Sequence, residues 1–432
     1  MSSGVKDMQG TISDRTVFSL LEEAYASCPD KEVIFDQYRR MTYRELYQES
    51  LQMAAGLSRL GVNKGDRVAV CLPNWHEFVI ILFALTKIGA VLVPVNIRYR
   101  AAEIQYILEN SEAKVAFIAE KYEDIHHFSL FRSAGQKLNS LQHLITVRFK
   151  EEGYTSYEEL LKTGESLTVD EAAIRPADDL FSILYTSGTT GLPKGAMLTH
   201  RNVVNIARLA GQKMQCTPDD VYLIPVPVLH VMGLMFILRA VTYQGKLVLM
   251  EKYKAEEALR LIQDERVTVH PGVPTMFILE LNHPNFKAYD LSSLRTGEMA
   301  AAPCPVEIVR RIRTEMNCDV LVAYGMTETS ATLTMADFSD PDEYRAETVG
   351  RALPGMEIKI VDDKRREVPR GEVGELACRS VGLMKGYYKR EKETREAIDE
   401  EGWFYSGDLA TMDEQGYVRI VGRKKEMIIR GG

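Results

Sequence analysis

The sequence predicts an α/β protein in which two doubly wound α/β subdomains are followed by a small β-rich subdomain. Short apolar strands alternate with helical patterns between residue 42 and about residue 344, as in parallel sheets with crossover helices. After about residue 345, short strands separated by turn signals replace that alternation. A length of 432 residues also exceeds one ordinary domain, so two or three packed units are expected.

The first subdomain, residues 1–178, is expected to form the first parallel sheet. Thr42 and Glu45 fit a capping box, in which each side chain bonds the other residue's backbone at a helix start. The apolar window 78–95 contains Lys87 and suits a buried helix and strand better than a membrane span. The expected elements are helices at 43–60, 78–88 and 101–110, strands at 67–72, 90–95 and 115–118, and a less regular stretch at 120–178.

The second subdomain, residues 179–344, continues the alternation, and the third, residues 345–424, is β-rich. The expected strands are 181–185, 246–250, 267–269 and 319–322 in the second, and 358–361, 374–378 and 417–421 in the third. The expected helices are 200–213, 254–265 and 303–316. The apolar run at 426–429 stops just before Gly432, which predicts that a further C-terminal piece belongs to the natural protein.

Charge and cysteine pattern exclude several classes of protein. A net charge of −8 argues against a dedicated nucleic-acid-binding protein, whose binding face is usually basic. Six scattered cysteines form no CxxC pair, which predicts reduced thiols in a cytoplasmic protein. The eight histidines show no paired ligand spacing, so no zinc site is expected. The N-terminus lacks the apolar core of a signal peptide, and no integral membrane segment is expected.

The most informative stretch is a loop rich in glycine and hydroxyl residues after the apolar run 180–185. Glycine lets backbone N–H groups approach an anion, hydroxyls add short donors, and Lys194 adds a mobile positive charge. The loop is not a Walker motif, because Lys194 lies between Pro193 and Gly195. A phosphate site is favoured over an ordinary polar surface loop. The residues of this site are Thr186, Ser187, Gly188, Thr189, Thr190, Gly191 and Lys194.

Four further motifs follow this loop in order. They are PVLHVMG at 227–233, YGMTET at 324–329, GWFYSGDL at 402–409 and GRKKE at 422–426. Together with the loop at 186–195, they resemble the acyl-CoA synthetases of the adenylate-forming superfamily. The segment LRTGEMAAAPCP at 294–305 is most similar to the medium-chain branch. The resemblance covers nearly the whole chain and implies an acid–thiol ligase.

Such an enzyme uses ATP, Mg²⁺ and coenzyme A to convert a fatty acid first to acyl-AMP and then to acyl-CoA. The carboxylate and ATP are both anions, so the site must neutralise charge and align the reactants. The resemblance implies that Lys194 and the loop hydroxyls hold the β- and γ-phosphates, and that Thr327 contacts the α-phosphate. Glu328 would bind Mg²⁺, which prefers one or two carboxylates together with phosphate oxygens. Thr327, Glu328 and Lys194 are therefore the expected catalytic residues.

The same resemblance implies a nucleoside site. Tyr324, with Gly325 beside it, would offer its ring to adenine, and Ala301 and Ala302 would allow close approach to that ring. Asp408 would accept hydrogen bonds from both ribose hydroxyls. The alternatives are core packing for Tyr324 and an ordinary turn position for Asp408.

The GRKKE motif is expected to contribute to nucleotide binding and to inter-domain rotation. Arg423 would contact the ribose or a phosphate, and Lys424 is expected to be a solvated charge. Lys425 occupies the position of the family's hinge, within the segment 425–432, where many relatives carry aspartate. In the family, the catalytic lysine lies in a further C-terminal domain of about a hundred residues, so this chain is expected to bind ATP and acyl-AMP with impaired turnover.

The acyl group is expected to lie near His230, Met232, Gly233 and Gly325. His230 resembles the family's acyl-pocket gate, and a core or capping histidine is the alternative. Residues 225–245 contain no Asp or Glu, so this segment offers no carboxylate that could pair with the ammonium group of an amino-acid substrate. A medium- or long-chain fatty acid is therefore favoured, an aryl acid stays open, and part of this apolar segment is expected to be core.

Three functions remain open. An acyl-CoA ligase is the first, an adenylating module that passes its acyl group to a carrier protein is the second, and a non-catalytic nucleotide-binding protein is the third. The expected partners are small molecules, with a homodimer as a further prediction.

Overall fold

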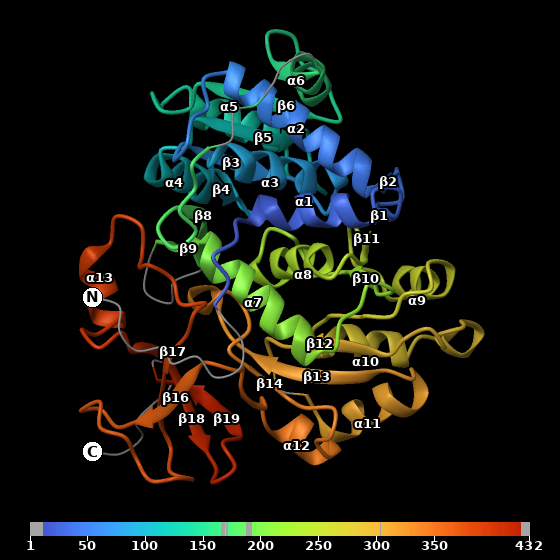
Figure 1. Ribbon diagram of the computed structural model, residues 1–432, viewed down its shortest axis with the longest axis vertical. Helices are drawn as coiled ribbons and strands as arrows, with labels where there is room; N and C mark the ends of the chain where they lie inside the picture. The colour runs from blue at the N-terminus through green and yellow to red at the C-terminus, as the bar shows by residue number, and fades with distance from the viewer. Residues whose placement is uncertain (1–11, 166–168, 170–171, 187–191, 303, 425–432) are drawn as a thin grey trace.

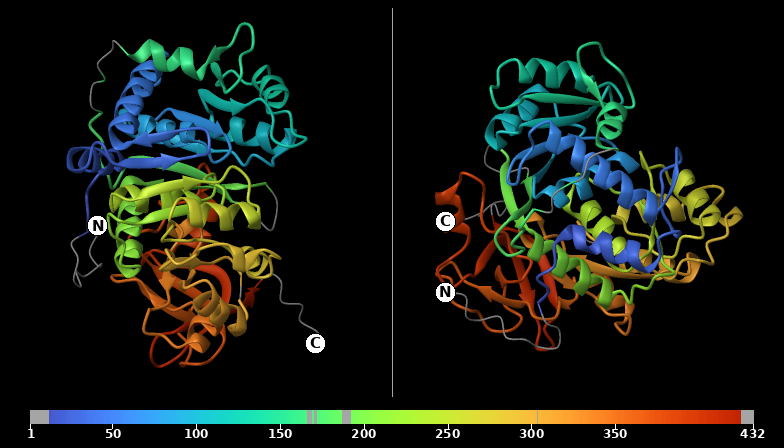
Figure 2. Two further views of the ribbon diagram at one scale, coloured as in Figure 1. Left: turned by 90° about the vertical axis from the view of Figure 1, so that its right-hand side faces the viewer. Right: turned by 45° about the horizontal axis from the view of Figure 1, so that its top comes forward.

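The computed structural model describes residues 12–165, 169, 172–186, 192–302 and 304–424. Its elements form four β-sheets covered by helices. In Figure 1, the sheet with β3–β9 and its helices occupy one end of the molecule, and the sheet with β16–β19 lies toward the opposite end. The two views in Figure 2 show the same order.

The seven-stranded sheet has the order β7-β6-β5-β3-β4-β8-β9 and is parallel except for the antiparallel pair β8–β9. The crossovers β3–α3–β4 and β4–α4–β5 step in opposite directions along the sheet, so right-handed connections place α3 and α4 on opposite faces. The predicted doubly wound arrangement is confirmed. The strands are β3 (Arg67–Cys71), β4 (Val91–Pro94), β5 (Val115–Ala119), β6 (His143–Val147), β7 (Thr155–Ser156), β8 (Leu180–Thr186) and β9 (Lys194–Thr199). The helices beside them are α2 (Tyr43–Arg59), α3 (His76–Ile88), α4 (Ala101–Ser111), α5 (His127–Gly135) and α6 (Tyr157–Gly164).

Two local predictions in this part are confirmed and one is wrong. The Thr42–Glu45 capping box is present, and every residue of α3 is buried, as expected for the apolar window that begins at residue 78. Among the described residues, no helix has the length and apolar character needed to cross a bilayer. The stretch 120–178 is more regular than expected, because it contains α5, β6, β7 and α6. A second capping box, formed by Ser156 and Glu159, starts α6 and was the missed local signal.

The second group of strands forms two four-stranded sheets, β10-β11-β1-β2 and β12-β13-β14-β15, connected through isolated bridges at Val269. The predicted strand at 267–269 is therefore wrong as a strand, because the structure has only isolated bridges there. Arg266 before it has a left-handed backbone conformation, and Pro271 after it has no N–H to donate to a neighbouring strand. The strands are β1 (Glu32–Phe35), β2 (Arg40–Thr42), β10 (Val221–Ile224), β11 (Lys246–Leu249), β12 (Thr296–Met299), β13 (Asp319–Tyr324), β14 (Thr334–Met335) and β15 (Arg351–Ala352). The helices are α1 (Val17–Ser27), α7 (His200–Lys213), α8 (Val231–Thr242), α9 (Ala255–Asp264), α10 (Pro274–Leu281), α11 (Val306–Glu315) and α12 (Asp342–Glu347), with short 3₁₀ turns at Phe286–Ala288 and Thr327–Thr329.

The sheets are interleaved across the subdomain division expected at residue 178. Strands β1 and β2 precede that residue but pair with β11, and β8 and β9 follow it but extend the sheet of β4. The chain therefore crosses between the two sheet systems more than once. The local pattern of apolar residues does not show which strands pair when they lie some two hundred positions apart.

The β-rich part is an antiparallel sheet of order β16-β17-β18-β19, accompanied by α13 (Glu391–Ala397). Its strands are β16 (Glu357–Val361), β17 (Gly374–Arg379), β18 (Phe404–Met412) and β19 (Val418–Arg423). The register pairs Asp408 of β18 with Arg423 of β19. Two residues that the sequence assigned to one nucleotide site are thus neighbours in the sheet.

The fold contains a buried histidine that makes stability depend on pH. The N–H of Val17 donates to Nδ1 of His200 over 3.1 Å, and burial lowers the pKa of His200 to about 4, from 6.5. Because the folded pKa is the lower one, the stabilisation is complete above pH 6.5 and is lost as the pH falls toward 4, at about 1.4 kcal/mol per pH unit. In His200→Asn, the amide oxygen would accept the same N–H without titrating. Urea unfolding at pH 7, 6 and 5 should show the wild type losing its advantage over this variant, and parallel curves would contradict the assignment.

Candidate active site

The phosphate loop predicted at 186–195 lies on the hairpin between β8 and β9. Thr186 pairs with Lys194 at the end of the two strands, and the Thr186 hydroxyl donates to the Lys194 carbonyl over 3.3 Å. The strand pairing therefore brings the two ends of the predicted loop together. The predicted phosphate residues between them, Ser187, Gly188, Thr189, Thr190 and Gly191, lie outside the described residues.

The second motif, at 324–329, follows the carboxyl end of β13. A Cβ on Gly325 would lie 1.4 Å from the carbonyl oxygen of Ala331, so only glycine permits this close return of the backbone. The expected pocket role of Gly325 stays a prediction, because this contact alone accounts for the glycine. The Thr327–Thr329 turn then presents Thr327 and Glu328, both half-buried.

A short segment, residues 384–388, connects this motif to the phosphate hairpin. The N–H of Met384 donates to the carbonyl of Glu328 over 2.8 Å, and that of Tyr388 donates to the carbonyl of Gly195 over 2.8 Å. The Tyr387 hydroxyl donates to Oε1 of Glu328 over 2.8 Å, and the Lys194 ammonium lies 4.9 Å from the centre of the Tyr387 ring. Sequence reasoning missed Tyr387, since an aromatic residue beside a glycine carries no distinctive signal. The structure thus brings Lys194 and Glu328 to one side chain.

The predicted nucleoside residues meet at Asp408. The Tyr324 hydroxyl donates to Oδ2 of Asp408 over 2.6 Å, and Nε of Arg423 donates to Oδ1 over 3.1 Å. Burial, and then the neighbouring Asp408 charge, hold the pKa of Tyr324 well above its usual range, so this hydroxyl stays a donor. A carboxylate has about four acceptor sites, and these two bonds leave room for two more donors. A ribose with two hydroxyl groups fits this acceptor.

Two other predicted nucleoside residues, Ala301 and Ala302, follow β12 and are exposed. Ala301 has φ of 75°, in the left-handed region, so the backbone turns sharply at this position. Nothing in the contacts of these residues assigns them a ligand, and their adenine role stays a prediction.

Lys424 was predicted to be a solvated charge, but in the structure its ammonium group is paired with two carboxylates. Its ammonium lies 2.9 Å from Oδ1 of Asp363 and 3.0 Å from Oε2 of Glu375. The other oxygen of Glu375 accepts the N–H of Gly407 over 3.0 Å. Lys424 is therefore fixed to the sheet that carries Asp408. The expected hinge residue Lys425 lies outside the described residues.

The predicted acyl residues lie at the start of α8. His230 is the N-cap residue of that helix, and its Nε2 lies 3.3 Å from Nδ2 of Asn96. His230 is exposed as a residue, yet surrounding protein atoms desolvate its ring enough to lower its pKa, so the neutral form is favoured. Met232 is half-buried, and a Cβ on Gly233 would lie 2.4 Å from the carbonyl oxygen of Pro227. Gly233 therefore permits close packing, and its pocket role stays a prediction.

Asn74 is a further residue that sequence reasoning missed. Its amide nitrogen donates to the carbonyls of Ile224 and Val226, and its oxygen accepts the N–H of Val228. This buried side chain from the loop before α3 holds the segment that leads to His230. The signal could not be found locally, because the three partners lie about 150 positions away.

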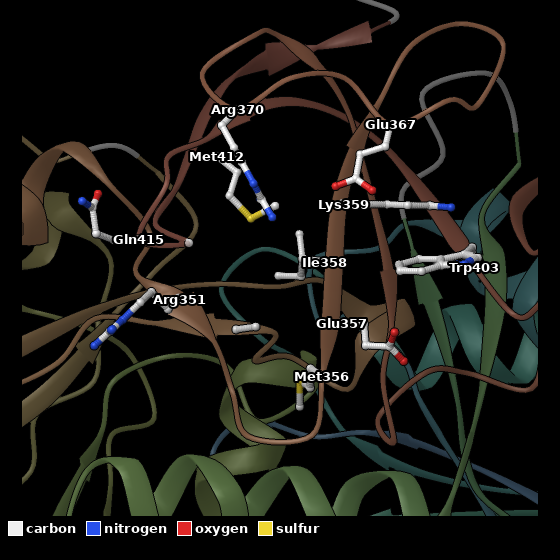
Figure 3. Close-up of a pocket in the computed structure, with 12 residues that line it drawn as sticks. Arg351, Met356, Glu357, Ile358, Lys359, Glu367, Arg370, Trp403, Met412 and Gln415 are labelled. Atoms are coloured by element: carbon white, nitrogen blue, oxygen red, sulfur yellow. The ribbon is translucent and has the colours of Figure 1, made fainter. Parts of the chain in front are cut away.

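A cluster of charged side chains and a surface hollow lie outside these motifs. Asp36, His76 and Glu77 are close enough to hold a cation, but Arg148 already bonds Asp36 and Glu77 over 2.6–2.8 Å. A hollow of about 510 Å³ lies beside the edge strand β16. Figure 3 shows the side chains that line it, among them Arg370, Glu367 and Ile358. None of its lining residues belongs to the predicted site.

Comparison with known proteins agrees with this geometry. The family model described as AMP-binding enzyme matches residues 21–388. The putative acyl-CoA synthetase YngI of Bacillus subtilis is 40% identical, over 96% of this chain and 80% of that protein. The medium-chain fatty-acid–CoA ligase of Escherichia coli is 33% identical, over 98% of this chain and 75% of that protein. A crystal structure of a putative long-chain-fatty-acid CoA ligase from Rhodopseudomonas palustris superposes with a TM-score of 0.86 at 27% identity, over 96% of this chain and all of that one. The chain belongs to the family of AMP-binding enzymes.

Proposed function

We propose that the protein uses ATP to activate a medium- or long-chain fatty acid as acyl-AMP and then transfers the acyl group to coenzyme A. The observation that supports it most is the convergence of a phosphate hairpin, Glu328 and the Tyr324–Asp408–Arg423 group in a chain similar to acyl-CoA ligases. In the first step, a carboxylate oxygen attacks the α-phosphorus and pyrophosphate leaves. In the second step, the thiol of coenzyme A attacks the acyl carbonyl and AMP leaves.

Different residues of the site would bind different parts of ATP. Lys194 and Thr186 would hold the outer phosphates, Thr327 the α-phosphate, and Asp408 the ribose. Glu328 fits a Mg²⁺ ligand, because Tyr387 occupies Oε1, while no hydrogen bond reaches Oε2 from the described residues. When bound, Mg²⁺ would neutralise phosphate charge and favour departure of pyrophosphate.

The acyl site is proposed to be apolar. No acidic residue lies between 225 and 245, and in α8 the half-buried Val231 and Met232 are its most accessible apolar side chains near His230. Leu234, Met235 and Phe236 are fully or almost fully buried and form core, as expected for part of this segment. The names of the relatives, medium-chain and long-chain ligases, support an alkyl substrate.

A panel of acids tests the function. Thioester formation with coenzyme A and ATP should be greatest among fatty acids of about 8 to 16 carbons, with benzoate as the aryl member. Product formed only on a carrier protein would favour the second function, and ATP binding without any acyl product would favour the non-catalytic one. Extending the chain past Gly432 and comparing pyrophosphate release tests whether further sequence raises turnover.

Asp408→Ala should weaken binding of AMP or of an acyl-AMP analogue about 100-fold. Two charge-assisted hydrogen bonds of roughly 1.5 kcal/mol each would be lost, and Tyr324 and Arg423 would lose the acceptor that orients them. Isothermal titration measures the affinity, and the control is Glu414→Ala, an exposed glutamate in the turn between β18 and β19. An unchanged affinity in Asp408→Ala would show that Asp408 only holds Tyr324 and Arg423 in place and does not bind the ribose.

The cellular compartment and the oligomeric state of the protein are also proposals. All six cysteines are free thiols, five of them buried, which supports a reducing compartment such as the cytoplasm. Light scattering in solution would test the predicted homodimer.

A further inference from the structure

We propose that Tyr387 is a positioning residue that keeps Glu328 and Lys194 apart, so that the carboxylate stays available to Mg²⁺ and the ammonium to phosphate. The inference rests on the proposed function, since it concerns the same ATP site. It adds a residue from outside the motifs that identified that site. It also explains how two opposite charges on neighbouring elements avoid neutralising each other.

The first support is the position of the side chain. Tyr387 is 7% exposed, its hydroxyl oxygen lies 2.8 Å from Oε1 of Glu328, and the Lys194 ammonium lies 4.9 Å from its ring centre. Among the described residues, no ion pair joins Lys194 to Glu328, and neither forms one with any other residue. Each charged group therefore faces a neutral part of one aromatic side chain, the phenol hydroxyl in one case and the ring face in the other.

The second support is that the backbone of Tyr387 is fixed on two sides. Residue 387 forms a bridge with Ala196 of β9, next to Lys194 and Gly195. Its N–H donates to the hydroxyl of Thr394 in α13 over 2.9 Å, and that hydroxyl donates to the carbonyl of Arg390 over 2.8 Å. These contacts fix the backbone from which the Tyr387 side chain extends between Lys194 and Glu328.

The third support is the chemistry of the phenol. A tyrosine hydroxyl carries its proton at neutral pH, and that of Tyr387 donates it to Oε1 of Glu328 over 2.8 Å. A donor on Oε1 orients the carboxylate and leaves Oε2 as the oxygen for a cation, as outer partners of metal ligands do. The ring face attracts the ammonium without removing its charge. A carboxylate at the same place would have paired with Lys194 instead.

Two substitutions separate the parts of the side chain. Tyr387→Phe removes only the hydroxyl and should weaken Mn²⁺ binding to the protein–ATP complex about tenfold. In the same variant, ATP affinity measured in excess EDTA should change less than about twofold, because the ring remains under Lys194. Tyr387→Leu removes the ring as well and should weaken ATP binding in EDTA too. The matched control is Tyr388→Phe, because the Tyr388 hydroxyl makes no hydrogen bond among the described residues.

Electron paramagnetic resonance of free Mn²⁺ gives the metal affinity without any turnover, and isothermal titration gives the ATP affinity. Combining Tyr387→Phe with Glu328→Gln should add no further loss of Mn²⁺ binding, because the hydroxyl acts through that carboxylate. Unchanged Mn²⁺ affinity in Tyr387→Phe, or an equal loss in the Glu328→Gln background, would overturn the inference and leave the proposed function intact. A wild-type chain that binds neither ATP nor Mn²⁺ would overturn both.

Discussion

Replacing Glu328 with alanine should lower the rate of acyl-AMP formation about 1000-fold at saturating ATP and Mg²⁺. The proposed ligand is a carboxylate that presents one uncommitted oxygen beside the phosphate hairpin, and Mg²⁺ takes one or two such oxygens together with phosphate. Losing a metal contact that stabilises the leaving pyrophosphate corresponds to about 4 kcal/mol in the barrier. The loss should appear in the rate more than in ATP binding, since Lys194 and Asp408 remain.

Exchange of labelled pyrophosphate into ATP measures this step without coenzyme A. The control is Glu367→Ala, an exposed glutamate that lines the hollow in Figure 3 and lies outside the predicted site. Heating curves with and without Mg²⁺·ATP add a second measurement, because Glu328→Ala should lose the part of the stabilisation that depends on Mg²⁺. Full exchange activity in Glu328→Ala would show that this carboxylate does not bind the metal.

The sequence allowed prediction of elements that depend on near neighbours. The Thr42–Glu45 capping box and the largely apolar helix α3 involve residues within a few positions of each other, and both are present. The pairing of β1 with β11 was out of reach, because its two strands lie about 210 residues apart and each is only four residues long. Short strands carry too few alternating positions to indicate their partner.

In the candidate site too, residues in local motifs could be predicted, and residues that act through distant partners could not. Asp408, Tyr324 and Arg423 were recognisable from motifs, and the structure brings all three into contact. Tyr387 and Asn74 were not, because each acts through bonds to segments that are distant in the chain. Residues of this kind have no pattern of their own until the fold places their partners.

The ion pair between Arg239 and Glu298 should be the most sensitive structural contact described for the core. Arg239 of α8 is 0% exposed and Glu298 of β12 is 3% exposed, with Nη1 of the arginine 2.8 Å from Oε2 of the glutamate. Thr332 donates to the other carboxylate oxygen over 3.3 Å. The pair connects α8, whose N-cap is His230, with β12, which leads to Ala301, so it joins the proposed acyl and adenine sides.

Arg239→Met should lower the free energy of unfolding by about 3–5 kcal/mol at pH 7, because it leaves the Glu298 charge buried without its partner. The double variant Arg239→Met/Glu298→Met should recover most of that loss, since no unpaired charge remains. The control is the ion pair between the half-buried Glu257 and the exposed Arg260, and Arg260→Ala should cost less than about 1 kcal/mol. Urea unfolding measures all three variants.

The double variant separates lost charge pairing from lost packing, because it removes both charges and leaves apolar side chains of similar length in their place. Recovery of stability in the double variant would assign the Arg239→Met penalty to the unpaired charge of Glu298. A double variant no more stable than Arg239→Met would mean that α8 and β12 are held together by the shape of the arginine side chain and not by its charge.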